Sequence, residues 1–149
     1  NGALTIGTLD GANIEIREQV GAENIFIFGL QAHEVTSLKA RGYAPETFVA
    51  SNPDLARTLD MIDSGYFSPA NVFDGKPIVG RLLSDGEPYF VLADFAAYAK
   101  AQDEVDALYL QPDEWSRKAV LNALGMGTFS SDRSIREYAE RIWRIKPVL

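Results

Sequence analysis

The sequence contains no cysteine, only one histidine and fewer basic than acidic side chains, and each shortage argues against a class of function. Without cysteine, disulfides and thiolate metal sites are excluded, which fits a reducing compartment and leads us to expect a cytoplasmic protein. Fourteen basic against 21 acidic side chains give a formal charge of -7. Because this charge repels phosphate backbones and anionic lipids, nucleic acid is not expected as a partner.

Long hydrophobic runs are also missing. The longest uncharged apolar stretches, such as residues 25–30, fall far short of the roughly 20 residues that span a bilayer, so no membrane-crossing segment is predicted. The chain starts at Asn1 with neither an initiator methionine nor a basic stretch ahead of an apolar one, so no signal peptide is predicted. We interpret this start as the cut edge of a longer chain.

The hydrophobic pattern predicts an α/β fold. With 46% hydrophobic residues, 149 residues suffice for one domain that buries roughly 70% of the surface of its unfolded chain. Residues 24–28 form a nearly continuous apolar run before Gly29, which is typical of a parallel strand buried on both faces. Residues 31–41 are polar with Val35 and Leu38 on one face, which predicts a covering helix.

The segment that follows the β-prone residues 3–8 permits two interpretations. Asp10 and Gly11 could form a two-residue hairpin turn, since the apolar residues beyond them continue a period of two. Alternatively, Asp10 caps a helix that ends at Gly21. The residues alone leave this choice open.

Most of the remaining chain has helical spacing. After Pro53 a helix is predicted up to about Tyr66, followed by loops over residues 67–86 with a short helix around 78–83. Residues 89–92 are either a short strand or the lead into the next helix. Three helices are predicted from Asp94 onward, and the last carries the apolar stripe Ile135, Tyr138, Ala139, Ile142 and Trp143, with capping oxygens ahead of it at Ser130, Ser131 and Asp132.

Motifs that carry chemistry are sparse. His33 has no second histidine or cysteine to complete a metal site, so we interpret it as a surface residue of a helix. Ser130 and Ser131 lack a histidine that could activate them, and helix capping explains them better than catalysis. Tyr109 and Trp115 are interpreted as core residues, not as a sugar-stacking platform.

Two glycines also need an interpretation. Gly7 and Gly11 follow a strand, at a position where backbone N–H groups can hold phosphate, but the three-glycine dinucleotide pattern is absent. We therefore interpret them as a structural turn from strand to helix. Taken by themselves, the residues indicate an α/β domain of unknown role.

A family resemblance adds what the spacing cannot. Residues 1–13 closely resemble the segment that directly follows the cofactor lysine in the glycogen (α-glucan) phosphorylases. The similarity covers nearly the whole chain, with residues 43–51 and 72–87 looking freely variable. It continues through residues 23–29, residues 65–69, residues 93–95 with Tyr98, and residues 129–143.

The resemblance implies a phosphorylase that uses inorganic phosphate to release the terminal α-1,4-linked glucose of an α-glucan as glucose 1-phosphate, with retained configuration. The implied cofactor is pyridoxal phosphate, whose own phosphate group relays the proton in that family. The family's Schiff-base lysine stands four residues ahead of the position of Asn1 and is therefore expected to be missing here. Asn1 is the only residue assigned to the cofactor signature, and no catalytic or metal-binding residue is assigned.

The implied fold is the two-domain glycosyltransferase arrangement called GT-B, in which this chain would form part of the C-terminal Rossmann-like domain. Residues 1–149 would be a single partial domain, with β-α units over 1–92 and C-terminal helices over 93–149. Within the latter, residues 130–143 would cross back to the other domain. This assignment favours the helix for residues 10–21.

The resemblance further implies an allosteric, cytoplasmic homodimer whose isolated C-terminal piece is inactive. One alternative is a maltodextrin or starch phosphorylase, since the surfaces that select glucan length lie outside this segment. An alternative of another class is a non-catalytic binding or interaction module that has this fold.

Overall fold

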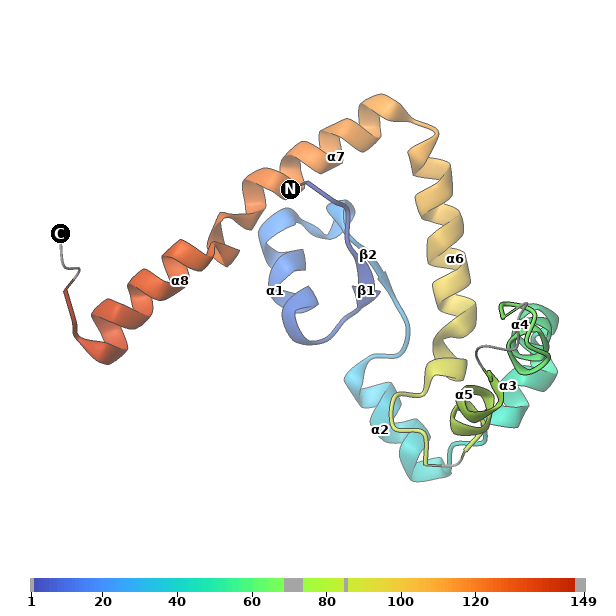
Figure 1. The fold of residues 1–149 in the computed structure, drawn as a ribbon. Coiled ribbons are helices and arrows are strands. Elements are labelled where there is room, and N and C mark those ends of the chain that lie inside the picture. The colour runs from blue at the N-terminus through green and yellow to red at the C-terminus, as the bar shows by residue number, and fades with distance from the viewer. Residues whose placement is uncertain (1, 69–73, 85, 147–149) are drawn as a thin grey trace. The chain divides into compact units, whose positions relative to one another are not determined.

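The structure is a computed structural model that describes residues 2–68, 74–84 and 86–146 (Figure 1). Contacts divide the chain into two compact units, which we call the terminal unit (1–7, 11–26 and 105–149) and the central unit (8–10 and 27–104). The described elements are β1 (Ile6–Thr8), α1 (Gly11–Val20), the 3-10 helix η1 (Ala22–Asn24), β2 (Phe26–Phe28), α2 (Ala32–Arg41), α3 (Pro45–Ser51), α4 (Pro53–Asp63), α5 (Lys76–Leu82), α6 (Val91–Tyr109), α7 (Pro112–Gly125), the 3-10 helix η2 (Met126–Phe129), α8 (Ser131–Glu137) and the π-helix η3 (Tyr138–Trp143).

A small parallel sheet forms the start of the fold. Strands β1 and β2 pair with each other, and α1 lies between them in the chain, as parallel strands require a crossover connection (Figure 1). The helical interpretation of residues 10–21 is thereby confirmed and the hairpin is not formed. The helix ends at Gly21, whose φ of 88° suits glycine and whose N–H donates to the carbonyl of Arg17 at 3.0 Å.

The described chain is mostly helical, and its α/β character rests on this one sheet. The strand predicted over residues 24–28 is present as β2 but is half-buried, not buried on both faces. In the described residues the sheet has only two strands, so each strand has one edge that no neighbouring strand pairs with. Ile25, just before β2, is buried, with 6% of its surface exposed.

Two asparagines join the helices of the terminal unit. Asn24 and Asn122 are 2% and 1% exposed, and both amides donate to backbone carbonyls. The Nδ2 of Asn122 donates to the carbonyl of Asn24 at 2.8 Å and to that of Lys118 at 3.0 Å, while the Nδ2 of Asn24 donates to Val20 at 2.7 Å. Because these bonds link α7 to the end of α1 and to η1, a polar pair takes the place of an apolar contact here.

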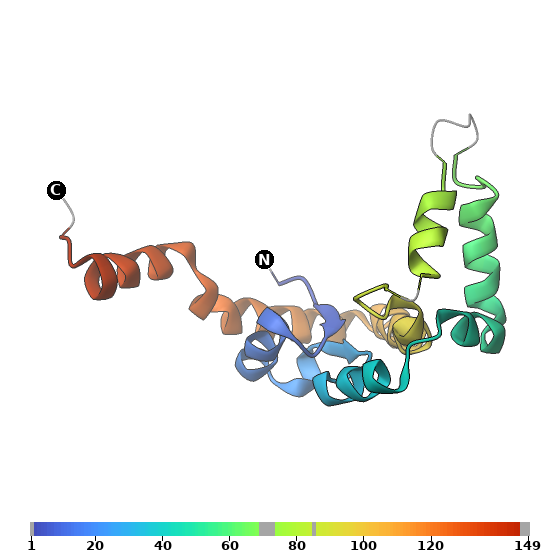
Figure 2. The same ribbon diagram turned by 90° about the horizontal axis from the view of Figure 1, so that it is seen from below.

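Helices α3, α4 and α5 surround the apolar core of the central unit, and α4 and α5 lie side by side (Figure 2). The predicted helix after Pro53 is confirmed as α4, which Asn52 caps by accepting N–H bonds from Asp54 and Leu55 at 3.1 and 3.0 Å. The short helix predicted around 78–83 is confirmed as α5. Helix α3 lies where the sequence suggested only variable residues. The core residues are Leu55, Leu59, Val79 and Leu92.

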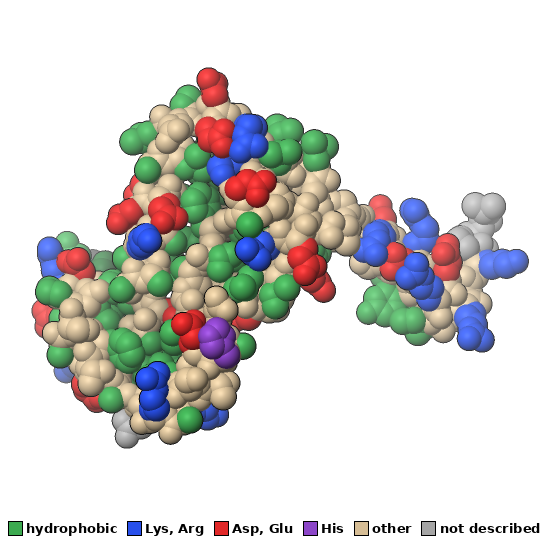
Figure 3. Space-filling model, turned by 180° about the vertical axis from the view of Figure 1, so that it is seen from behind, with side chains coloured by type: hydrophobic (Ala, Val, Ile, Leu, Met, Phe, Trp, Pro, Cys, Tyr) green, Lys and Arg blue, Asp and Glu red, His purple; other side chains and the backbone are tan. Residues whose placement is uncertain are grey.

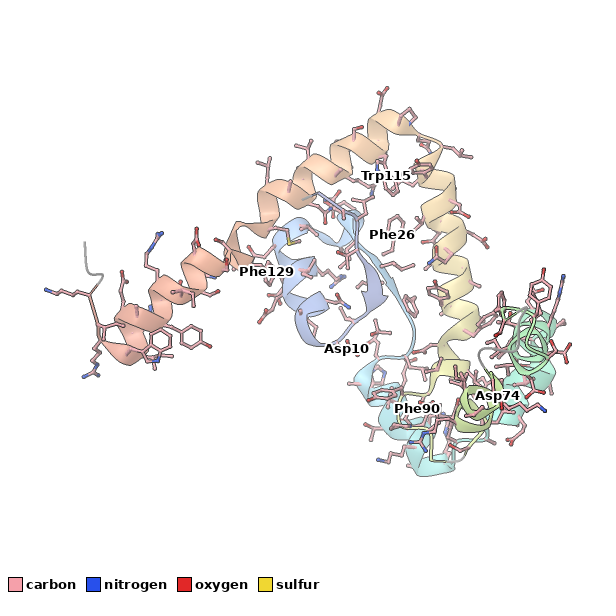
Figure 4. The ribbon with its side chains drawn as sticks, in the orientation of Figure 1. Asp10, Phe26, Asp74, Phe90, Trp115 and Phe129 are labelled. Atoms are coloured by element: carbon pink, nitrogen blue, oxygen red, sulfur yellow. The ribbon has the colours of Figure 1, made fainter. Side chains whose placement is uncertain are left out.

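Residues 89–92 lead into the next helix and do not form a strand, because α6 begins at Val91. The carboxylate of Glu87, only 4% exposed, accepts N–H bonds from Tyr89 at 2.7 Å and Val91 at 3.0 Å. Phe90 adopts a φ of 55° and packs its ring 4.7 Å from that of Tyr43 (Figure 4). Because a left-handed residue and a capping carboxylate interrupt the extended backbone, no strand forms here.

The C-terminal helices differ in detail from the prediction. Residues 131–143 are helical as predicted, but the last turns are a π-helix and Ser130 makes no side-chain capping bond at the start of α8. Tyr109 and Trp115 pack edge to face at 5.1 Å. Tyr109 is 67% exposed, so its assignment to the core was wrong, whereas Trp115 is half-buried. The stripe predicted on the last helix is solvent-exposed in the described chain, with Trp143 54% exposed.

Candidate functional site

The carboxyl ends of both strands and the first turns of α6 border one pocket of the central unit, which we call the strand-end pocket. Its volume is about 510 Å³, within the range of small-molecule sites. In α/β folds, ligands bind at the carboxyl ends of parallel strands. Figure 4 shows Asp10 just beyond the end of β1. The side chains that line it include Thr8, Asp10, Phe28, Asp94, Phe95 and Tyr98.

Asp94 holds the chain at the end of β2. Its Oδ1 accepts the N–H of Leu30 at 2.8 Å, a bond between residues 64 positions apart in the sequence. Gly29 lies between the strand and this bond with a φ of 80°, and a Cβ at that position would lie 2.7 Å from Oδ2 of Asp94. Any residue with a side chain would therefore be strained twice, by its backbone angle and by the carboxylate.

The pocket is electrostatically acidic. Burial raises the pKa of Asp94, with smaller contributions in the same direction from Glu34 and Asp10, and the hydrogen bond from Leu30 opposes the shift. Among the described residues that line the pocket, none is lysine, arginine or histidine. The site therefore presents hydrogen-bond acceptors and has no cation to attract an anionic group.

Aromatic rings form the other wall. Tyr98 packs edge to face against Phe28 with ring centroids 5.3 Å apart, and its hydroxyl accepts the amide of Gln102 at 2.8 Å. Tyr98 remains 41% exposed, and Tyr89 at the rim is 80% exposed. Exposed rings beside carboxylates offer flat apolar faces next to acceptors, an arrangement suited to amphipathic ligands.

The residues singled out by sequence lie elsewhere. His33 is exposed on α2, where it was predicted (Figure 3). Gly11, with a φ of 46°, starts α1, so the strand-to-helix turn is confirmed. Asn1 lies outside the described residues. In the part of the chain that the structure describes, no three histidine, aspartate or glutamate side chains group as metal ligands, and no helix is long and apolar enough to cross a bilayer.

Asp94 was not found as a site residue by sequence reasoning. Its contact with Leu30 depends on tertiary structure, and the only local signals are Gly29 after a strand and a carboxylate in the first turn of a helix.

Pyridoxal phosphate, the cofactor implied by the resemblance, does not fit the strand-end pocket. Such a cofactor needs a lysine amine and donors for its phosphate, whereas the described lining offers carboxylates and rings. Lys100 on α6 is exposed and faces Glu104 at 4.0 Å, and Lys118 donates to the carbonyl of Glu23. Neither lysine lines the strand-end pocket.

Comparison with known proteins identifies the family. Residues 1–145 match the Phosphorylase family, described as carbohydrate phosphorylase. The glycogen phosphorylase of Synechocystis sp. is 53% identical over 149 residues, which is 100% of this chain. That of Chlamydia pneumoniae is 48% identical over 97% of the chain, and the human brain form is 46% identical over 99%. The chain belongs to the carbohydrate phosphorylase family, which confirms the resemblance to glycogen phosphorylases.

The match covers only part of each relative. The chain spans 17% of the length of the Synechocystis and human proteins and 18% of that of the Chlamydia protein. The chain therefore corresponds to one portion of the relatives that it matches.

The raised pKa of Asp94 predicts that the stability of the fold depends on pH. Because the folded state binds this proton more tightly than the unfolded state, the free energy of unfolding should fall as pH rises from about 3.9, the ordinary aspartate value, through the higher folded pKa. Asp94→Asn retains an acceptor for Leu30 and should remove this contribution. Hydrogen exchange of the α6 amides across that pH range measures the contribution. Asp103→Asn, at an exposed position of the same helix, is the control. Equal pH profiles for wild type and Asp94→Asn would contradict the assignment.

Proposed function

We propose that the polypeptide containing this chain is a glycogen phosphorylase that cleaves terminal α-1,4-linked glucose with inorganic phosphate and releases glucose 1-phosphate. The observation that supports the proposal is the 53% identity to a glycogen phosphorylase over all 149 residues of this chain. We further propose that the intact enzyme uses pyridoxal phosphate. The lysine that binds it and the groups that contact the substrate phosphate belong to other parts of the polypeptide.

Within that enzyme we propose that this chain is part of a GT-B C-terminal domain and acts as scaffold behind the cofactor. Residues 1–92 would contribute β-α units to one domain, and residues 93–149 its closing helices. The exposed apolar side chains of Ile135, Ile142 and Trp143 support a role for residues 130–143 as the element that packs on a second domain. We also propose a cytoplasmic homodimer as the working form.

Two proteins test this proposal: the intact polypeptide and the 149-residue chain alone. The intact protein with pyridoxal phosphate is expected to release glucose 1-phosphate from glycogen only when inorganic phosphate is present, and the isolated chain is expected to release none. A coupled assay for glucose 1-phosphate measures both, and borohydride reduction followed by mass spectrometry locates the cofactor-bearing lysine.

Two results would contradict the proposal. If the intact protein carries the cofactor but does not phosphorolyse glycogen, the proposed activity is wrong. If a lysine of residues 1–149 carries a stoichiometric reduced adduct and the isolated chain is active, the proposed scaffold role is wrong.

A further inference from the structure

We propose that a second pocket of the central unit binds the zwitterion of a free α-amino acid with an apolar side chain, with Glu87 accepting from its ammonium group and Lys39 donating to its carboxylate. The pocket lies between the end of α2 and the turn that leads into α6, and we call it the α2-end pocket. Its volume is about 530 Å³, and its lining includes Lys39, Gly42, Tyr43, Gly86, Glu87 and Phe90. The described linings of this pocket and of the strand-end pocket have no residue in common.

The α2-end pocket offers one charge of each sign. Glu87 is 4% exposed, and its two oxygens accept one N–H each, from Tyr89 and from Val91. An ionised carboxylate has about four acceptor positions, so both oxygens can accept further donors. Among the described residues, neither Glu87 nor Lys39 has an oppositely charged partner within 4.0 Å. An occupant with a single charge would meet one like-charged side chain, whereas a zwitterion complements both.

Tyr43 supplies an apolar wall and an unused polar atom. Its side chain is 9% exposed, and its hydroxyl makes no hydrogen bond of acceptable geometry to the described residues. Burial and then the charge of Glu87 raise the pKa of this hydroxyl, while the nearby N–H groups of Leu92 and Ala93 oppose the shift. The hydroxyl is therefore neutral near pH 7 and available as an acceptor for an ammonium group that reaches Glu87.

Phe90 forms the other aromatic wall in a strained conformation. Its φ of 55° is unfavourable for a residue with a large side chain, and its ring lies edge to face on Tyr43 at 4.7 Å (Figure 4). Such strain is concentrated at ligand sites, because the surroundings must hold the residue in place. Gly42 and Gly86 bring no side chain to the rim. The rings therefore suit an apolar side chain, and the glycines leave room for the charged end of an amino acid.

A covering protein segment matches these groups less well. The backbone N–H groups of a segment are neutral, and Glu87 already accepts two such groups from its own turn. Backbone carbonyls are likewise neutral partners for Lys39. A free amino acid instead carries a full positive and a full negative charge on one small molecule, so its hydrogen bonds to Glu87 and Lys39 are charge-assisted from both sides.

The experiment measures the binding of L-leucine to the intact protein by titration calorimetry, beside three compounds with the same side chain. 3-Methylbutan-1-amine lacks the carboxylate, 4-methylpentanoate lacks the ammonium group, and N-acetyl-L-leucinamide stands for a neutral protein segment. Each is expected to bind about tenfold more weakly than leucine, because at least one charge-assisted hydrogen bond is lost.

Three variants locate the site. Glu87→Gln is expected to lower the affinity for leucine about tenfold, and Lys39→Met about threefold because Lys39 is exposed. Tyr43→Phe keeps the ring but removes the acceptor, so it should also lower the affinity about threefold. Lys76→Met, an exposed lysine at the start of α5 outside the pocket, is the matched control for Lys39→Met and should leave the affinity unchanged.

Three results overturn the inference: no saturable binding of leucine, equal affinity for leucine and N-acetyl-L-leucinamide, or equal leucine affinity of Lys39→Met and Lys76→Met. Because Lys39 is exposed, Lys39→Met decides the question even if Glu87→Gln does not fold. If Lys39→Met lowers the thermal midpoint and the wild type binds no leucine, Lys39 and Glu87 neutralise each other and the inference is wrong. Phosphorolysis of glycogen is assayed separately, so failure of this site leaves the proposed function untouched.

Discussion

Gly75→Ala is expected to destabilise the packing of α4 against α5 by about 3 kcal/mol, at the upper end of the usual cost of overpacking. Gly75 precedes α5, and a Cβ on it would overlap the carbonyl oxygen of Ile62 in α4 and lie 2.9 Å from the Cγ2 of the same residue. Because the obstacle is backbone, no rotamer change relieves it. Hydrogen exchange of the α4 and α5 amides in the intact protein measures the local opening free energy.

Gly80→Ala is the matched control. Gly80 lies inside α5, and apart from its chain neighbours and the nearby backbone of its own helix no heavy atom lies within 4 Å of the position that its Cβ would take. Alanine there should slow exchange and stabilise the helix by about 1 kcal/mol, because glycine is a poor helix former. If both substitutions changed the local opening free energy in the same direction, the close approach of Gly75 to Ile62 would not determine how these helices pack.

Asn122→Ala is expected to cost roughly 3 kcal/mol in the terminal unit. The substitution removes both bonds donated by the buried amide, so the carbonyl of Asn24 loses this donor and a small cavity remains. Faster exchange of the amides of α7 and α1 measures the loss.

Ser116→Ala, on an exposed position of α7, should change the same exchange rates by less than about 0.5 kcal/mol. Asn122→Asp adds a second comparison: it keeps the side-chain volume but replaces the donor by an acceptor, so it should be as damaging as alanine. If Asn122→Asp were tolerated, packing volume and not hydrogen bonding would explain the burial of this residue.

Local patterns in the sequence determined the helices and the family. The spacing of Leu55, Leu59 and Ile62 after Pro53 specified α4, because one apolar face must be buried and proline tolerates the first turn. Residues 1–13 identified the family before any fold was described, and the match over residues 1–145 confirmed it. For residues 10–21, the residues alone left helix and hairpin equally open, and it was the family resemblance that correctly favoured the helix.

The tertiary structure alone decided where distant polar groups meet. The bond from Leu30 to Asp94 joins residues 64 positions apart, and the bond from Asn122 to Asn24 joins residues 98 apart. No periodicity marks either pair, because a hydrogen bond between two elements depends on how their backbones are placed and not on the order of residues within one element. The same reason explains why Tyr109 was misjudged as core: it ends α6 while Trp115 lies in α7, and only the packed chain decides whether anything covers the two rings.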